Sequence, residues 1–267
     1  CVIDLTFVDT PNDQLSAYYP GGGRLAFNRV GVGASGAAAS SAGDGERVTA
    51  AGESVQLIVI ALPKAGGPMV EVTYSLTDGD DFLTVTSRYS NPHKEAITVE
   101  LEDRVRADRS FTAAADAKTN VSWWDDEWFG QAYGLIPVNA AIEGLADDAT
   151  PSRNGRDPVR YAIDGTSSVE LPPGGSVELV RRLVPAGSLL ALRARAAEMA
   201  EQPLRRVAVA VTDAGGGVPG AMVVASNATG RYAAGRTDAE GRLAVELPTT
   251  GQGWSLEASA VGRGSTT

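Results

Sequence analysis

Residues 69–105 read MVEVTYSLTDGDDFLTVTSRYSNPHKEAITVELEDRV, and this stretch decides the fold class. It holds three β-rich runs, Met69–Leu76, Phe82–Tyr89 and Ala96–Val105, separated by the turn-forming segments TDGDD and NPHK. Such short turns join antiparallel neighbours, because parallel strands need a long crossover. In the first run apolar residues alternate with polar ones, as in a strand with one buried face. The stretch therefore predicts an antiparallel meander.

The pattern of short strands extends in both directions, so we predict an all-β fold class. Further strands are expected at Val55–Leu62, Gly134–Val138, Val159–Ile163 and Val177–Val184. The tract from Gly31 to Gly45 has almost no large apolar side chain and is expected to form a surface loop. No helix is expected before residue 187.

A helix and a second β unit follow residue 187. Ser188 is a suitable N-cap for a helix from Leu189 to Glu201, which Pro203 would end. Beyond it, valines alternate with small residues from Val207 onward, as in a new strand. We predict a β domain over residues 1–187, a connecting helix over 188–204 and a small β-sandwich over 205–267.

Composition excludes several classes of function. The 267 residues include 23 basic and 33 acidic side chains, a net charge of −10, which would repel a nucleic-acid backbone. No apolar run approaches the roughly 20 residues of a membrane helix. One cysteine and one histidine allow neither an internal disulfide nor a Cys- or His-rich metal site, so we predict no metal or cofactor. Cys1 is either the start of a strand running through Val2–Thr6 or a lipid-anchor site.

The second β unit resembles a carboxypeptidase regulatory-like domain. The resemblance rests on alternating valines, a Pro-Gly-Ala turn, a TDxxGR turn and two later strand segments. These are Val207, Val209, Val211, Asp213, Pro219–Ala221, Val223, Thr237, Asp238, Gly241, Arg242, Leu247, Pro248, Leu256 and Ala258. It implies a seven-stranded sandwich related to transthyretin and immunoglobulin-like folds, usually a non-catalytic part of a secreted or surface protein.

The first unit is similar to the β-supersandwich domains of the galactose-mutarotase-like group. This similarity rests on Val70–Leu76, Asp78–Asp80, Phe82–Asn91 and Leu171–Ser176. The order of the two domains is similar to that in large bacterial secreted proteins, some of which carry a metallohydrolase domain downstream. The resemblance implies a secreted or envelope location, and a catalytic domain of the same parent protein as a partner outside these residues.

The most unusual string is WWDDEWF, from Trp123 to Phe129. Indole rings stack on the flat faces of sugars and carboxylates accept hydrogen bonds from hydroxyl groups, so the string suits a carbohydrate site. The candidate ligand-binding residues are Trp123, Trp124, Asp125, Asp126, Glu127 and Trp128. The alternative is that the rings fill a core, and the frequency of buried tryptophans in proteins favours this alternative. On a strand, Trp124, Asp126 and Trp128 would share one face, opposite Trp123, Asp125 and Glu127.

Three functional hypotheses remain open. The favoured one is a non-catalytic accessory or binding region, with carbohydrate as the ligand. The second is a scaffold that positions a catalytic domain elsewhere in the parent protein. The third is a sugar-active enzyme, in which Glu102 or Asp103 would supply the second member of a carboxylate pair. His93 lies in an Asn-Pro-His-Lys turn, and Asp78, Asp80 and Asp81 lie in a hairpin turn rather than in an EF-hand loop. We therefore assign no catalytic residue.

Overall fold

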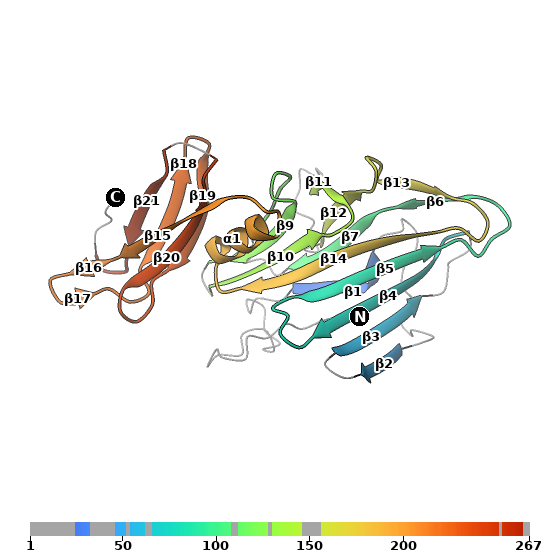
Figure 1. The fold of residues 1–267 in the computed structure, drawn as a ribbon, viewed down its shortest axis with the longest axis horizontal. Coiled ribbons are helices and arrows are strands. Elements are labelled where there is room, and N and C mark those ends of the chain that lie inside the picture. Colours follow the sequence, from blue (N-terminus) through green and yellow to red (C-terminus); the bar gives the residue numbers. More distant parts are fainter. Residues whose placement is uncertain are drawn as a thin grey trace. The chain divides into compact units, whose positions relative to one another are not determined.

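The computed structural model describes residues 25–32, 46–51, 54–61, 66–107, 112–127, 130–145, 156–250 and 253–263 (Figure 1). It is built almost entirely from antiparallel strands, which confirms the predicted all-β class. The chain divides into two compact units: unit 1 comprises residues 1–124 and 134–184, and unit 2 comprises 125–133 and 185–267. The strand predicted at Val2–Thr6, most of the predicted loop, and Trp128 lie outside the described residues.

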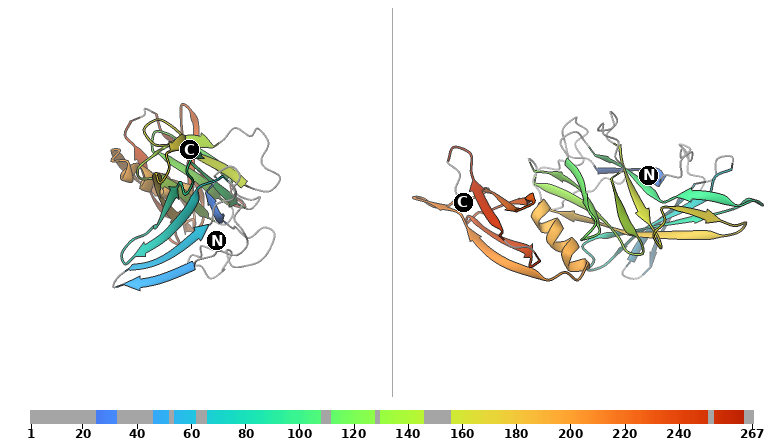
Figure 2. Two further views of the ribbon diagram at one scale, coloured as in Figure 1. Left: turned by 90° about the vertical axis from the view of Figure 1, so that its right-hand side faces the viewer. Right: turned by 90° about the horizontal axis from the view of Figure 1, so that it is seen from above.

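Unit 1 contains a large sheet, a smaller sheet and a two-stranded ribbon, and the left view of Figure 2 shows the blue-to-teal strands of the large sheet side by side. The large sheet has the order β2 (Glu46–Ala51), β3 (Ser54–Ala61), β4 (Met69–Thr77), β5 (Leu83–Ser90), β14 (Ser176–Ala186), β10 (Gln131–Pro137), β9 (Val121–Asp126) and β8 (Thr112–Asp116). The smaller sheet has the order β1 (Leu25–Val32), β7 (Glu102–Ala107), β12 (Arg156–Ala162) and β11 (Ala141–Leu145). The ribbon pairs β13 (Ser168–Leu171) with β6 (Ile97–Glu100).

The predicted meander is correct for its first two strands and wrong for its third. β4 and β5 pair along their length, but the other neighbour of β5 is β14. The predicted strand Ala96–Val105 is divided at Leu101 into β6 and β7, which belong to different sheets. The buried Leu101 donates its N–H to the carbonyl of Ser167 and accepts a hydrogen bond from the N–H of Tyr161. The chain thus changes sheets at one residue without leaving a backbone group unpaired.

Alternation along β4, β5 and β14 turns one set of side chains inward. The inward set includes Val72, Tyr74, Tyr89, Leu179 and Leu183, all of which are buried. Burial raises the pKa of Tyr74 to about 12, while Arg181 lowers it and Asp103 raises it. The outward set on the same strands is mostly polar and half-buried or exposed; the exceptions include the apolar Met69 and Val180 and the buried Val184. One face of this part of the sheet is therefore core, as the alternation in β4 predicts.

Unit 2 consists of a helix and two main groups of strands. The strands are β15 (Leu204–Ala210) paired with β20 (Arg242–Pro248), the short pair β16 (Thr212–Asp213) and β17 (Gly216–Gly217), and a sheet of β19 (Gly230–Arg236), β18 (Met222–Asn227) and β21 (Ser255–Ser259). Helix α1 (Leu189–Met199) lies against β19 and β20, and Figure 2 shows it in orange beside the strands of this unit. Ser188 caps it as predicted, with its Oγ accepting the N–H of Ala191 at 3.2 Å.

Arg193 fixes the helix to β19. Its guanidinium carbon lies 3.6 Å from the ring centroid of Tyr232, and its Nη1 donates to the backbone carbonyl of Tyr232 at 3.0 Å. The Tyr232 ring in turn meets Trp254 edge to face, at a centroid distance of 4.9 Å. A cation over an aromatic face adds to the apolar packing of the leucines and alanines on the same side of the helix.

The TDxxGR turn closes unit 2 by backbone contacts. The carboxylate of Asp238 accepts the N–H groups of Glu240 and Arg242, and the buried Thr237 hydroxyl donates to the carbonyl of Val218. Gly241 has φ +76°, and a Cβ at this position would lie 2.5 Å from the carbonyl oxygen of Val211. Glycine is thus required here both by the backbone conformation and by the space available.

The helix is shorter than predicted, since it ends at Met199 rather than Glu201. Among the described residues, no helix has the length and apolar character needed to cross a membrane. The domain boundaries at residues 187 and 204 stay a prediction.

Candidate functional site

Strand β9 carries most of the tryptophan–acid segment, which we define as Trp123, Trp124, Asp125, Asp126, Glu127 and Trp128. Every residue of β9 is buried, so both faces of this strand are covered. The exposed fraction is 7% for Trp123 and 0% for Trp124. An indole buried to this extent offers no free ring face for stacking on a sugar. These two tryptophans therefore pack in the interior, while the binding role of the segment as a whole stays a prediction.

The two aspartates of the segment are buried on opposite faces of the strand. Asp125 is 6% exposed and Asp126 is 1% exposed, and successive side chains of a strand point to opposite sides. Two carboxyl groups in this arrangement cannot flank the same glycosidic bond, as a glycosidase requires. Burial raises the pKa of Asp125 to about 6; Arg231 lowers this pKa and Asp126 raises it.

Glu127, at the half-buried end of the segment, is held by two arginines of β19. Arg231 forms an ion pair with its carboxylate, and Arg236 donates from Nη2 to its backbone carbonyl at 3.3 Å. All three residues belong to unit 2. The Glu127 side chain is 39% exposed. The ion pair therefore orients this side chain while solvent can still reach it.

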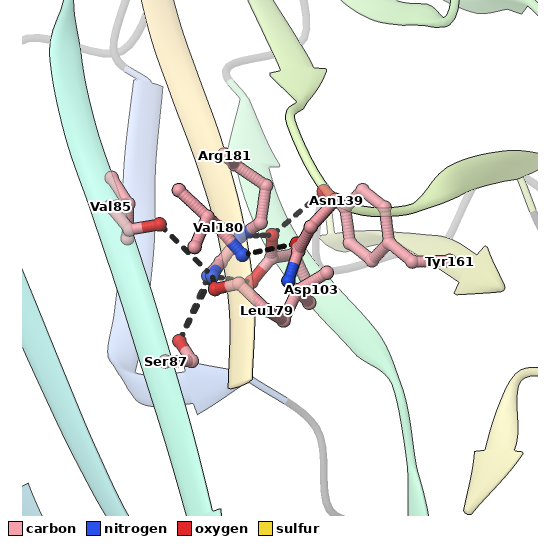
Figure 3. A network of polar contacts seen from close by, with 8 residues as sticks. All are labelled: Val85, Ser87, Asp103, Asn139, Tyr161, Leu179, Val180 and Arg181. Carbon is pink, nitrogen blue, oxygen red and sulfur yellow. Dashed lines mark hydrogen bonds and ion pairs between the residues drawn. The ribbon is translucent and has the colours of Figure 1, made fainter. Parts of the chain in front are cut away.

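Arg181 is a buried charged group of unit 1 with many hydrogen-bond partners (Figure 3). Its Nε donates to Asp103 Oδ2 at 2.8 Å and its Nη2 to Oδ1 at 2.9 Å, which is a bidentate ion pair. The remaining donors reach the carbonyls of Leu179 and Val85 and the hydroxyl of Ser87. Although burial disfavours a charged guanidinium, Asp103 holds the pKa of Arg181 above its ordinary value.

This network joins the two sheets of unit 1, because Asp103 lies on β7 and Arg181 on β14. Tyr161 on β12 donates its hydroxyl to Asp103 Oδ2 at 2.7 Å, and burial raises the pKa of that tyrosine well above its ordinary value. Asn139, also drawn in Figure 3, accepts the N–H of Val180 and donates to the carbonyl of Glu178, and so binds the backbone of β14. Asp103 is fully engaged in this brace, so it does not supply the second carboxylate of a catalytic pair.

Sequence reasoning missed this brace, although a signal for it exists. With a period of two along Val177–Val184, Arg181 falls on the same side as Leu179 and Leu183. A basic residue in an otherwise apolar inward set indicates a buried charge that needs a partner. Its partner is 78 residues away in the sequence, and no local pattern identifies it.

His93 and the three aspartates Asp78, Asp80 and Asp81, also considered from the sequence, lie in turns. His93 is half-buried, and its Nε2 lies 2.8 Å from the carbonyl oxygen of Gly67. The same turn is closed by Asn91, which accepts the N–H of His93 and donates to the carbonyl of Leu171. Asp78, Asp80 and Asp81 are exposed in the β4–β5 turn. Within the described ranges, no group of three or more His, Cys, Asp or Glu residues is placed to hold a metal ion.

Comparisons with known proteins identify no family. No family model matches the chain, and no curated protein matches it. Among solved structures, a TPR-domain protein from Parabacteroides distasonis is similar over 53% of this chain and 34% of its own, with 17% identity and a TM-score of 0.41. An α-galactosidase from Geobacillus stearothermophilus (50% and 24% coverage, 15% identity, TM-score 0.34) and a galactose mutarotase-like protein from Clostridium acetobutylicum (52% and 64%, 8%, 0.35) are also similar.

The chain thus spans about a third or less of the first two of these proteins and less than two thirds of the third. At TM-scores below 0.5 these likenesses carry no statement about what this chain does, because even a shared fold does not specify function.

Proposed function

We propose that this chain is a non-catalytic accessory or binding region of a larger secreted or envelope protein, and that its ligand is a carbohydrate. In this proposal unit 2 is a carboxypeptidase regulatory-like sandwich and unit 1 a mutarotase-like β domain without the mutarotase chemistry. The chain contributes by contact with a polysaccharide, and the chemistry belongs to a domain outside these residues.

The observation that carries the non-catalytic part of the proposal is how the three buried aspartates are arranged. Asp103 is bonded to Arg181 and Tyr161, and the other two buried aspartates, Asp125 and Asp126, occupy opposite faces of β9. A pair of carboxyl groups facing one substrate bond would need a different arrangement. The three aspartates therefore lie in the interior of the protein and do not form such a pair.

The carbohydrate part rests on the outer end of the tryptophan–acid segment. Glu127 is oriented by Arg231 and keeps part of its carboxylate exposed, and Trp128 is the next residue in the sequence. Between them, these two neighbouring residues of the sequence supply a carboxylate that can accept hydrogen bonds from sugar hydroxyls and an indole ring that can stack on a sugar.

Affinity electrophoresis of the full chain against a panel of soluble polysaccharides tests the proposal. We expect the wild-type protein to be retarded by at least one glycan, and Trp128→Ala to lose about tenfold in affinity. Trp254→Ala removes an indole from unit 2 and serves as the matched control, which we expect to bind as wild type. Wild-type protein that binds no glycan in the panel would disprove the carbohydrate function.

A further inference from the structure

The outward face of strands β4, β5 and β14 carries an ordered set of polar side chains. Register places the residues of the three strands directly opposite one another in three rows. We call this set the threonine face: Glu71, Arg88 and Glu178 form the first row, Thr73, Thr86 and Val180 the second, and Ser75, Thr84 and Arg182 the third. Strand spacing gives the face a width of roughly 10 Å and a length of roughly 14 Å.

Most polar groups of this face have no partner among the described residues; Arg182, which lies over the ring of Phe82, is an exception. Within the described part of the chain, the hydroxyls of Thr73, Thr84 and Thr86 make no hydrogen bond, and Arg88 makes no ion pair with Glu71 or Glu178. Arg88 and Glu178 are exposed and the threonines are half-buried. These donors and acceptors are therefore available to a ligand lying on the sheet.

The charges of the face balance one another. Glu71 and Glu178 offset Arg88 and Arg182, whereas the chain as a whole has a net charge of −10. A locally neutral face on an acidic protein neither attracts nor selects for a charged ligand. Hydroxyl groups that both donate and accept, with a guanidinium donor and carboxylate acceptors beside them, complement a ligand that is itself rich in hydroxyls.

An aromatic ring lies at one end of this face. Phe82 precedes β5, and the guanidinium carbon of Arg182 lies 4.7 Å from the centroid of its ring. Phe82 and Arg182 thus place an aromatic ring and a positive charge beside the third row. The first row instead has the carboxylates of Glu71 and Glu178 at its two ends. The face thus carries polar side chains in each of its rows and is bordered at one end by an aromatic ring.

From these observations we infer that the threonine face is the surface on which this protein holds a neutral polysaccharide chain. The inference rests on the proposed carbohydrate function and names a second contact surface, in unit 1, for the same class of ligand. It differs from the tryptophan–acid segment in residues and in strands, so each can be tested separately.

The test measures binding of the full chain to a neutral glucan, galactan and mannan, with polygalacturonate as the acidic arm. The variant Thr73→Val/Thr86→Val removes two hydroxyls while keeping residues that suit a strand. Arg88→Gln removes the positive charge that lies between Glu71 and Glu178 in the first row. Thr98→Val, on the exposed side of β6, is the matched control. Thermal melts of all variants check that each one is folded.

We expect the double valine variant and Arg88→Gln to bind the neutral glycan at least tenfold more weakly, with Thr98→Val unchanged. If wild type binds glycan and the face variants bind equally well, the inference is wrong and the proposed function stands. Preference for polygalacturonate would also overturn the inference. So would sedimentation data showing a wild-type dimer that the face variants abolish without any change in glycan binding. If wild type binds no glycan, the proposed function fails, and the inference fails with it.

Discussion

Arg181 is a charged side chain at a position where its strand otherwise turns leucines inward. Its bidentate bonds to Asp103 and its bonds to two carbonyls and a hydroxyl satisfy the guanidinium in a place that water does not reach. A buried ion pair adds little net stability by itself, but losing one partner leaves an uncompensated charge in the interior. The pair therefore specifies how the two sheets of unit 1 meet.

We expect Arg181→Met to lower the free energy of unfolding by about 3–5 kcal/mol, because it leaves the Asp103 carboxylate unpaired. Adding Asp103→Leu to that variant should recover a large part of the loss. Tyr161→Phe, which removes one hydrogen bond, should lose only about 1 kcal/mol. Urea denaturation followed by circular dichroism measures all three. A loss below about 1 kcal/mol for Arg181→Met would contradict the role assigned to the pair.

Asp125 gives unit 2 a dependence on pH. Its pKa of about 6 in the folded chain lies above the ordinary value of 3.8, so the folded state binds the proton more tightly than the unfolded state. The contribution of Asp125 to the free energy of unfolding is therefore fully present below about pH 4. This contribution falls by on the order of 2–3 kcal/mol as the pH rises through about 6.

Asp125→Asn should remove this loss and so stabilise the protein at pH 7, with no gain at pH 3.5. Melting temperatures across pH 3.5–7 measure the effect. Asp78→Asn, which changes the charge equally on an exposed turn, is the control. A melting curve for Asp125→Asn that falls with pH as steeply as wild type would show that Asp125 does not titrate in this range.

At the scale of the element, the TDxxGR turn is the most constrained connection of unit 2. Gly241 combines a positive φ with a backbone approach that excludes a Cβ, whereas Gly220 has a positive φ of +67° and open space around it. Gly241→Ala should therefore lose several kcal/mol of stability, and Gly220→Ala only about 1 kcal/mol from the backbone conformation. Chemical denaturation compares them, and equal losses would show that space at Gly241 is not limiting.

The elements that could be predicted are those with a local cause. Ser188 marks the start of α1 because its side chain can accept a nearby N–H, and β4 shows its buried face by alternation. The division at Leu101 could not be predicted, because both strands continue the same β-rich composition and the change of sheet depends on Ser167 and Tyr161. The buried positions of Trp123 and Trp124 agree with the core alternative that the sequence offered, but the strands that cover them could not be identified from a local pattern.

At the scale of the whole molecule, unit 2 is not one continuous stretch of chain. Residues 125–133 belong to it although the sequence on either side belongs to unit 1, and Glu127 is bonded there by Arg231 and Arg236. A chain ending at residue 187 would keep this segment and lose both arginines. The predicted boundary at 187 would therefore separate groups that are bonded in the full chain.

We expect a fragment of residues 1–187 to be cut by chymotrypsin, which cleaves after aromatic residues, between residues 125 and 133 several-fold faster than the full chain. The full chain carrying Arg231→Ala and Arg236→Ala should be cut at an intermediate rate. Limited digestion followed by mass spectrometry gives the rates. Equal rates for fragment and full chain would mean that the arginines do not protect the segment.

The change of sheet at Leu101 also limits how this protein can vary. The backbone passes from one sheet to the other at Leu101 alone. One amino acid inserted just after Leu101 would therefore exchange the inward-facing and outward-facing side chains of β7. Asp103 would then turn away from the arginine it neutralises, although every residue of the strand were still present. Homologous chains should therefore tolerate replacements along β7 far more readily than insertions or deletions between β6 and Asp103.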